Sequence, residues 1–150
     1  MKTFEAIPGT EIDQATCLMN LGAVYGSTGK FNDAEANCKE ALRMLEAIEG
    51  TEIEQARSLM NLGAVYKSTG KFNEAEANYK EALRMYKAIE GTDIEQAKCL
   101  TGLGILHGII QEEYSKARSV LKEALKICER YPQGTEEIKN VCLKVLGQIP

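Results

Sequence analysis

The side chains that most often carry out chemistry are few in this sequence and form no recognised reactive pattern. The lone histidine, His107, has no Cys, Ser or Asp partner at helical spacing, and an imidazole needs an orienting group and a nucleophile to catalyse covalent chemistry. The cysteines lack both the CxxC spacing of a zinc site and the pattern of a disulfide framework: Cys17, Cys38, Cys99, Cys128 and Cys142. We therefore expect reduced thiols, no metal, no cofactor and no enzymatic activity.

A second group of polar side chains suits recognition. Arg57, Lys67 and Lys98 recur along stripes without a carboxylate, although the chain has a net charge of −4. Asn20 and Asn61 can each present an amide donor and acceptor to a peptide backbone. This pattern favours an acidic, extended ligand. The alternatives are that the cations are solvated surface side chains and that the amides bridge neighbouring helices.

The elements that position these residues are copies of one repeated unit. Residues 9–49 align without a gap with residues 50–90 and are identical at 33 of 41 positions. A third copy spans 91–133 and takes one inserted residue before Tyr114 and another near Gln133. Because repeats of this length build arrays by stacking on their neighbours, we expect one array over the whole chain.

The two ends of the chain continue this pattern. Residues 1–8 contain Phe-Glu-Ala-Ile, which matches the Leu-Glu-Ala-Ile at the close of the first full copy, so we expect the end of a preceding helix there. Residues 134–150 begin a fourth copy. Their apolar side chains share one helical face, which predicts a capping helix over roughly 136–148: Ile138, Val141, Cys142, Val145 and Leu146.

Each full copy carries the signals of two helices. A Thr or Asn stands three residues before an acid at both expected helix starts of the first two copies and at the first start of the third, which is the spacing of a capping box: Thr10, Asn32, Thr51, Asn73 and Thr92. The second start of the third copy departs from this pattern, with Arg118 three residues after Ser115. Gly29 and Gly70 fall between the helices, where glycine permits a left-handed residue and a chain reversal. The first helix of copy one shows an i, i+3, i+4, i+7 stripe that we expect to be buried: Leu18, Leu21, Gly22 and Tyr25.

The third copy departs from the pattern at its turn. His107 replaces the tyrosine of the earlier copies, and Ile109 and Ile110 stand with three polar residues in place of Ser-Thr-Gly-Lys. We expect the histidine to be a structural substitution. The isoleucines either mark a contact surface or, as we favour, pack on the terminal helix.

These residues resemble the tetratricopeptide repeat family, in its long, kinesin-light-chain-like form of 41 or 42 residues. The resemblance lies in a Leu-Gly pair with a tyrosine three residues on, followed by a spaced set in the second helix: Leu62, Gly63, Tyr66, Phe72, Ala75, Tyr79 and Ala82. The usual repeat has about 34 residues. The additional residues amount to about two helical turns, one for each helix.

The resemblance implies an all-α fold: a right-handed superhelical solenoid of helix-turn-helix repeats with a C-terminal capping helix. In such arrays the first helix of each repeat lines a concave groove that holds a peptide or a helix of a partner protein, which would make this chain a scaffold or adaptor. Helical spacing places these residues in the groove: Thr16, Met19, Asn20, Ala23, Ser27, Arg57, Met60, Asn61, Ala64, Lys67, Lys98, Thr101, Ile105 and Ile109.

Charge and hydropathy limit the other function classes. A net charge of −4 disfavours a nucleic-acid partner, so an RNA-binding array is the least favoured alternative. No apolar stretch is long enough to span a membrane and no signal peptide is present, so we expect a cytoplasmic protein. The competing function is a structural arm that pairs with copies of itself through its ends, in particular through an uncapped N-terminal end.

Overall fold

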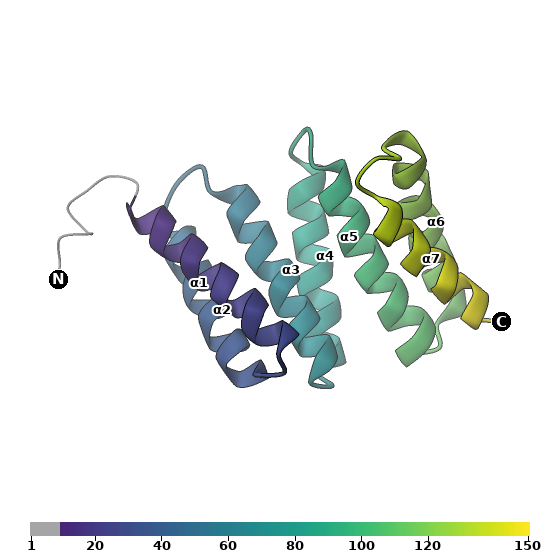
Figure 1. Ribbon diagram of the computed structural model, residues 1–150, viewed down its shortest axis with the longest axis horizontal. Coiled ribbons are helices and arrows are strands. Elements are labelled where there is room, and N and C mark those ends of the chain that lie inside the picture. The colour runs from purple at the N-terminus through teal and green to yellow at the C-terminus, as the bar shows by residue number, and fades with distance from the viewer. Residues whose placement is uncertain (1–9) are drawn as a thin grey trace. The chain divides into compact units, whose positions relative to one another are not determined.

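The computed structural model describes residues 10–150, and every regular element in this range is a helix. In chain order the elements are α1 (Thr10–Ser27), α2 (Phe31–Glu46), α3 (Glu52–Ser68), α4 (Phe72–Lys87), α5 (Asp93–Ile105), the π-helix η2 (Leu106–Ile110), α6 (Tyr114–Arg130) and α7 (Glu136–Gln148) (Figure 1). The all-α prediction is confirmed. The helix end expected in residues 1–8 lies outside the described range.

The chain divides into two compact units, residues 1–78 and 79–150, with the boundary inside α4. The superhelical handedness stays a prediction. None of the helices between residues 10 and 150 is long and apolar enough to cross a membrane.

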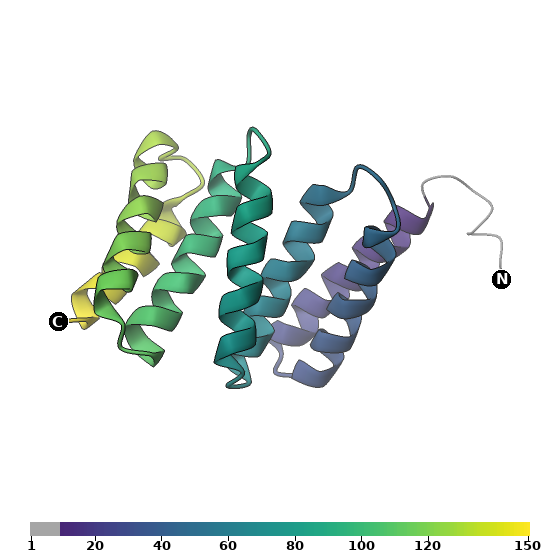
Figure 2. The same cartoon turned by 180° about the vertical axis from the view of Figure 1, so that it is seen from behind.

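In the first unit α1 and α2 form a hairpin, and α3 contacts both helices (Figures 1 and 2). Ala15, Met19 and Leu45 are fully buried where α1 meets α2. Close approach of the two helices requires Gly22, because a Cβ added there would lie 2.5 Å from the Cys38 Sγ.

The prediction of which residues form the buried stripe of α1 is partly wrong. Leu21 is 46% exposed, whereas Met19, which we expected in the groove, is fully buried. The buried residues of α1 are Ala15, Met19 and Gly22, which follow i, i+4, i+7 spacing and face α2. Leu21 lies on another face of the helix, one that is buried only in the later copies, where the equivalent Leu62 is 3% exposed.

In the second unit α5 contacts α6 and α7, and α6 contacts α7. The helix expected over 136–148 is present at those bounds. Cys142 and Val145 of α7 join the core of this unit, and the Thr101 Oγ1 lies 3.3 Å from the Cys142 Sγ. Gly104 of α5 leaves room for α6, because a Cβ there would lie 2.3 Å from a Leu121 methyl group.

The residue inserted before Tyr114 produces a change of helix type. The chain passes from α5 into η2, where the Gln111 amide donates to the Leu106 carbonyl across five residues at 2.9 Å. A π-turn absorbs one extra residue without ending the helix. Glu112 then takes a positive φ of 56°, which is uncommon for a residue other than glycine.

His107 of η2 is 3% exposed and holds the altered turn together. Its Nδ1 lies 3.0 Å from the Gln111 Oε1 and 3.1 Å from the Glu113 Oε1. The Glu113 amide also donates to the His107 carbonyl. Ile109 is 45% exposed, so this side chain is not buried against the terminal helix as we favoured.

A Gly-Thr joint connects each repeat to the next. Gly50, Gly91 and Gly134 have φ values of 83°, 84° and 87°, in the left-handed region that favours glycine. Each is followed by a buried threonine whose hydroxyl donates back to carbonyls near the end of the preceding helix. The Thr51 Oγ1 donates to the Leu45 carbonyl at 2.8 Å and to the Ile48 carbonyl at 2.9 Å.

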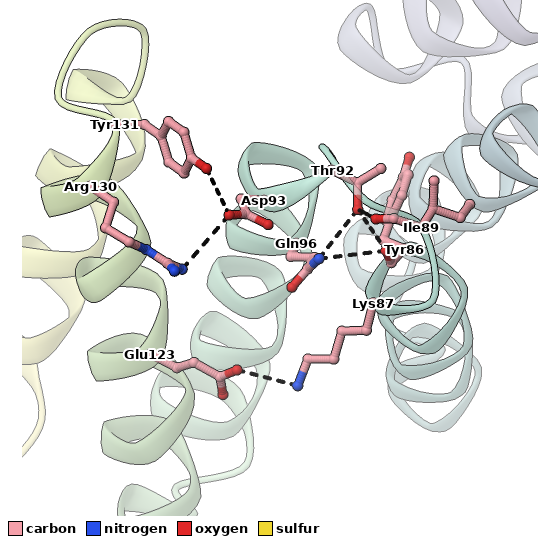
Figure 3. Close-up of polar contacts among 9 residues, drawn as sticks. All are labelled: Tyr86, Lys87, Ile89, Thr92, Asp93, Gln96, Glu123, Arg130 and Tyr131. Carbon is pink, nitrogen blue, oxygen red and sulfur yellow. Dashed lines mark hydrogen bonds and ion pairs between the residues drawn. The ribbon is translucent and has the colours of Figure 1, made fainter.

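The same joint recurs in the second unit (Figure 3). The Thr92 Oγ1 donates to the carbonyls of Tyr86 at 2.6 Å and Ile89 at 2.9 Å. Gln96 adds an amide contact to the Thr92 hydroxyl at 3.2 Å. Across the same unit, the Lys87 Nζ lies 3.2 Å from a Glu123 carboxylate oxygen.

These contacts correct the capping-box prediction. Thr51 and Thr92 do stand at the N-cap of their helices, but neither makes a side-chain cap hydrogen bond. Their hydroxyls donate to carbonyls at the C-terminal end of the preceding helix and do not cap the N-terminus of the following helix. The turns at Gly29 and Gly70 behave as expected, each with a φ of 82°.

We expect Thr51→Val to lower the free energy of unfolding by about 0.5 to 1.5 kcal/mol, because the Leu45 and Ile48 carbonyls lose the hydroxyl donor while the side-chain shape is kept and the Leu45 carbonyl still accepts from the Ile48 amide. Urea denaturation followed by circular dichroism measures the change. Thr28→Val is the matched control, since Thr28 is exposed and its carbonyl acceptors remain near water. An equal loss in both variants would contradict the structural role of the joint.

Candidate partner-binding surface

A hollow of about 300 Å³ lies between α1 and α3 in the first unit. We call it the α1–α3 hollow, and it is lined by mostly small residues: Gly22, Ala23, Gly26, Ser27, Phe31, Asn61, Ala64, Val65 and Ser68. Helical spacing had placed Ala23, Ser27, Asn61 and Ala64 in the groove, and the structure brings these four together.

Small side chains keep the hollow open. A Cβ added to Gly26 would meet only the Val65 Cγ2 at 3.8 Å and the Ala34 Cβ at 4.0 Å, both ordinary contacts. Ala23 and Ala64 are exposed on its two sides. Walls of this kind leave space for a polypeptide backbone to approach a helix closely.

Amide groups beside the hollow are available to a ligand. Asn61 is half-buried and Asn20 is exposed, and neither side chain hydrogen-bonds to another group in residues 10–150. The nearby hydroxyls are used within α1, because Ser27 donates to the Ala23 carbonyl at 3.1 Å. Thr16 likewise donates to its own helix, to the carbonyl of Ile12 at 2.9 Å.

The expected cations form no ion pairs in the part of the chain that the structure describes. Arg57 and Lys67 are half-buried on α3, and Lys98 is exposed on α5. By contrast, Lys39 of α2 lies 2.9 Å from a Glu35 carboxylate oxygen. Burial lowers the pKa of Lys67 from its usual value, so its charged form lacks part of its solvation and has no carboxylate to compensate.

Two of the expected groove residues lie in the core. Met19 packs between α1 and α2, and Thr101 is 8% exposed, with its hydroxyl donating to the Ala97 carbonyl at 2.8 Å. A partner cannot contact either side chain without opening the fold, so their assignment to the groove is wrong. Met60 and Ile105 are half-buried, and Ile109 is exposed.

Sequence reasoning missed Gly26 and Phe31, which also line the hollow. Gly26 is one of the few positions at which the first two copies differ, since its equivalent is Lys67. This difference between the two copies was the sequence signal that could have identified Gly26 as part of the hollow. It gives the first unit an open wall at the place where the second copy has a long side chain.

The reactive side chains do not assemble into a site. Burial raises the pKa of the Cys38 thiol to about 11 and that of Cys99 to about 12, so both thiols are protonated at neutral pH. Cys17 is exposed, and all five cysteines are free. Within residues 10–150 no group of three or more His, Cys, Asp or Glu side chains could hold a metal ion.

Paired antiparallel helices repeated along the chain define a helical repeat protein. The sequence model of the tetratricopeptide repeat matches residues 13–88 and 54–130, and the chain belongs to this family. Such repeats generally mediate protein–protein interaction, and the fold is typically a non-enzymatic scaffold.

Solved structures agree with this fold. The crystal structure of BtubC (BKLC) from P. vanneervenii superposes with a TM-score of 0.73 at 24% identity, over 86% of this chain and 53% of that one. A tpr-like protein (ct2138) from Chlorobium tepidum TLS gives a TM-score of 0.70 at 14% identity, covering 92% and 95%. The chain thus spans about half the length of BtubC. No curated protein gives a significant match.

We expect Gly26→Ala to raise the free energy of unfolding by up to about 1 kcal/mol, because alanine favours the helix and its methyl group fits. Gly22→Ala is the matched comparison, and we expect its effect on the free energy of unfolding to have the opposite sign. We expect it to cost about 1 to 3 kcal/mol, because its methyl group would overlap the Cys38 Sγ. Thermal unfolding of both variants checks the difference, and equal effects would contradict the packing described for α1 and α2.

We expect one cysteine of the native protein, Cys17, to react rapidly with a thiol reagent at neutral pH and low protein concentration. The other thiols are buried, and thiolate formation is suppressed where burial raises the pKa. Timed alkylation followed by peptide mass spectrometry identifies the modified residue. Rapid labelling of Cys38 or Cys99 without denaturant would contradict the described core.

Proposed function

We propose that this chain is an adaptor that binds an extended, acidic segment of a partner protein in the α1–α3 hollow. The observation that carries the proposal is an open hollow with small walls, with an unengaged Asn61 amide at its edge and uncompensated cations on α3. In this proposal the chain carries out no enzymatic step.

The shape of the hollow supports a peptide more than a compact small molecule. It lies open between two helices and is lined by alanine, glycine and serine. An extended backbone can follow such a surface while the Asn61 amide both donates to it and accepts from it. Because packed helices already form the hollow, little reorganisation of this protein is needed on binding.

Electrostatics supports an acidic ligand. Arg57 and Lys67 have no carboxylate partner between residues 10 and 150. A ligand carboxylate near Lys67 would stabilise the charged ammonium that burial disfavours.

The cysteines support a reducing compartment for this adaptor. Four of them are buried as free thiols, and stable free thiols are typical of proteins kept in the cytoplasm. We therefore include a cytoplasmic location in the proposal.

The test uses a fluorescein-labelled peptide of alternating glutamate and alanine, about ten residues long and therefore able to span the length of a helix. The same peptide with glutamine or lysine in place of glutamate is the control. Fluorescence anisotropy at about 50 mM salt keeps screening low. We expect the glutamate peptide to bind most tightly and Arg57→Glu to weaken it about tenfold, or about 1.4 kcal/mol.

Lys122→Glu is the matched control, because Lys122 is exposed on α6 in the other unit and does not line the α1–α3 hollow. It changes the net charge of the protein by the same amount as Arg57→Glu. We expect affinity to change much less in this variant. Equal affinity for all three peptides, or equal loss in both variants, would remove the acidic-ligand proposal.

A further inference from the structure

The basic side chains of the two helices beside the α1–α3 hollow all lie on α3. The sequence of α1 contains no Lys or Arg, and that of α3 contains Arg57 in its second turn and Lys67 in its last turn. Neither cation forms an ion pair or a side-chain hydrogen bond within residues 10–150. Positive charge in this pair of helices is therefore confined to two levels along α3.

The lysines of the neighbouring turns point elsewhere. Lys30, which follows α1, lies over the ring of Tyr25, with its Nζ 5.9 Å from the ring centroid. Lys71, which follows α3, lies over the ring of Tyr66 at 5.7 Å. Neither lysine lines the α1–α3 hollow.

Helical spacing places the two cations of α3 on either side of the uncharged hollow. One face of α3 carries residues spaced i, i+4, i+7 and i+11: Arg57, Asn61, Ala64 and Ser68. The last three line the hollow, and Arg57 lies one turn before them. Lys67 lies beside Ala64, about 60° around the helix axis, and its long side chain can reach a ligand that passes over Ala64.

Carboxylates of a ligand are disfavoured at the other levels of this surface. The first turns of α1 and α3, beyond Arg57, are acidic: Glu11, Asp13, Glu52 and Glu54. A ligand carboxylate there would meet like charge. Within the hollow the nine lining residues are all uncharged, so a carboxylate would lose water without gaining an ionic partner. Favourable positions remain only beside Arg57 and beside Lys67.

The separation of the two cations sets the spacing of the ligand's acidic residues. Arg57 and Lys67 are ten residues apart on one helix, which is about 15 Å along its axis. An extended chain rises about 3.3 Å per residue, so four or five residues cover this length. Residues four positions apart point to the same side of an extended chain, whereas residues five apart point to opposite sides. Four is therefore the best separation.

We propose that the segment bound in the α1–α3 hollow carries two acidic residues four positions apart, with uncharged residues between them. One carboxylate pairs with Arg57 and the other with Lys67. The residues between them cross the hollow, where the Asn61 amide holds their backbone. This inference rests on the proposed function, because it specifies the acidic segment that the adaptor binds.

The test uses four ten-residue peptides of alanine and glutamine with blocked termini and a fluorescein label. Three of them carry two glutamates, placed one, four or eight positions apart, and the fourth carries none. The three glutamate peptides have the same composition and net charge. We expect a separation of four to bind about threefold more tightly than one or eight, because it alone reaches both cations and so gains one further exposed ion pair. Fluorescence anisotropy at about 50 mM salt measures the affinities.

Two variants remove the cations one at a time. Arg57→Gln and Lys67→Gln each delete one charge and keep most of the side-chain length. We expect the advantage of a separation of four to disappear in both, because only one carboxylate then has a partner. Lys71→Gln is the matched control, since it deletes the same charge from the turn after α3, outside the hollow. This variant should keep the threefold advantage.

The possible outcomes separate this inference from the proposed function. Equal affinity for the three glutamate peptides, each above that of the uncharged peptide, would overturn the spacing and leave the acidic-ligand proposal standing. An advantage of four that persists in Lys67→Gln would also overturn the spacing, because that cation would then play no part. If no glutamate peptide bound more tightly than the uncharged one, the proposed function itself would fail, and the spacing with it.

Discussion

The buried hydroxyl of the Gly-Thr joint is the interaction on which the rest of the structure depends. At the end of every second helix, backbone carbonyls lose their partners within the helix while the following repeat covers them. Thr51 and Thr92 add a hydroxyl donor to the Leu45 and Tyr86 carbonyls, which also accept the Ile48 and Ile89 amides, and the glycine before each threonine takes the left-handed conformation. The glycine reverses the chain, and the threonine contact ties the end of one helix to the start of the next.

The position at which α3 starts decides which of its residues contact the preceding repeat. Once α3 begins after Thr51, Ser58 meets Met19 and Val65 meets Gly26. The α1–α3 hollow then exists because Gly26 is small where the next copy has Lys67. The proposed binding surface therefore arises where one residue, Gly26, differs from its equivalent in the next repeat.

The sequence predicted the elements well because its period is nearly exact. Two near-identical copies of 41 residues imply the same hairpin twice, and α7 lies where its apolar face predicted. Four of the expected groove residues, Ala23, Ser27, Asn61 and Ala64, line one hollow. That these four residues bind a partner is our proposal.

The failures have physical causes. A threonine followed by an acid fits both a capping box and a buried donor to the preceding helix, so spacing alone could not assign Thr51. Helical periodicity finds an apolar stripe but not which neighbour covers it, and α1 has apolar residues for both its own hairpin and a further joint. For that reason the sequence analysis placed Met19 in the groove and Leu21 in the core, whereas Met19 is buried and Leu21 is exposed. An inserted residue can be absorbed by a loop or a π-turn, and only the structure places it in η2.

The central claim is that the α1–α3 hollow binds an acidic peptide. Its most direct test is a nuclear magnetic resonance titration of the labelled protein with the alternating glutamate peptide. The account predicts that the Ala23 and Ala64 methyl groups and the Asn61 side-chain amide shift together, while the surface of α6 does not. Shifts confined to α6 and α7, with those of Ala23, Ala64 and Asn61 unchanged, would contradict it.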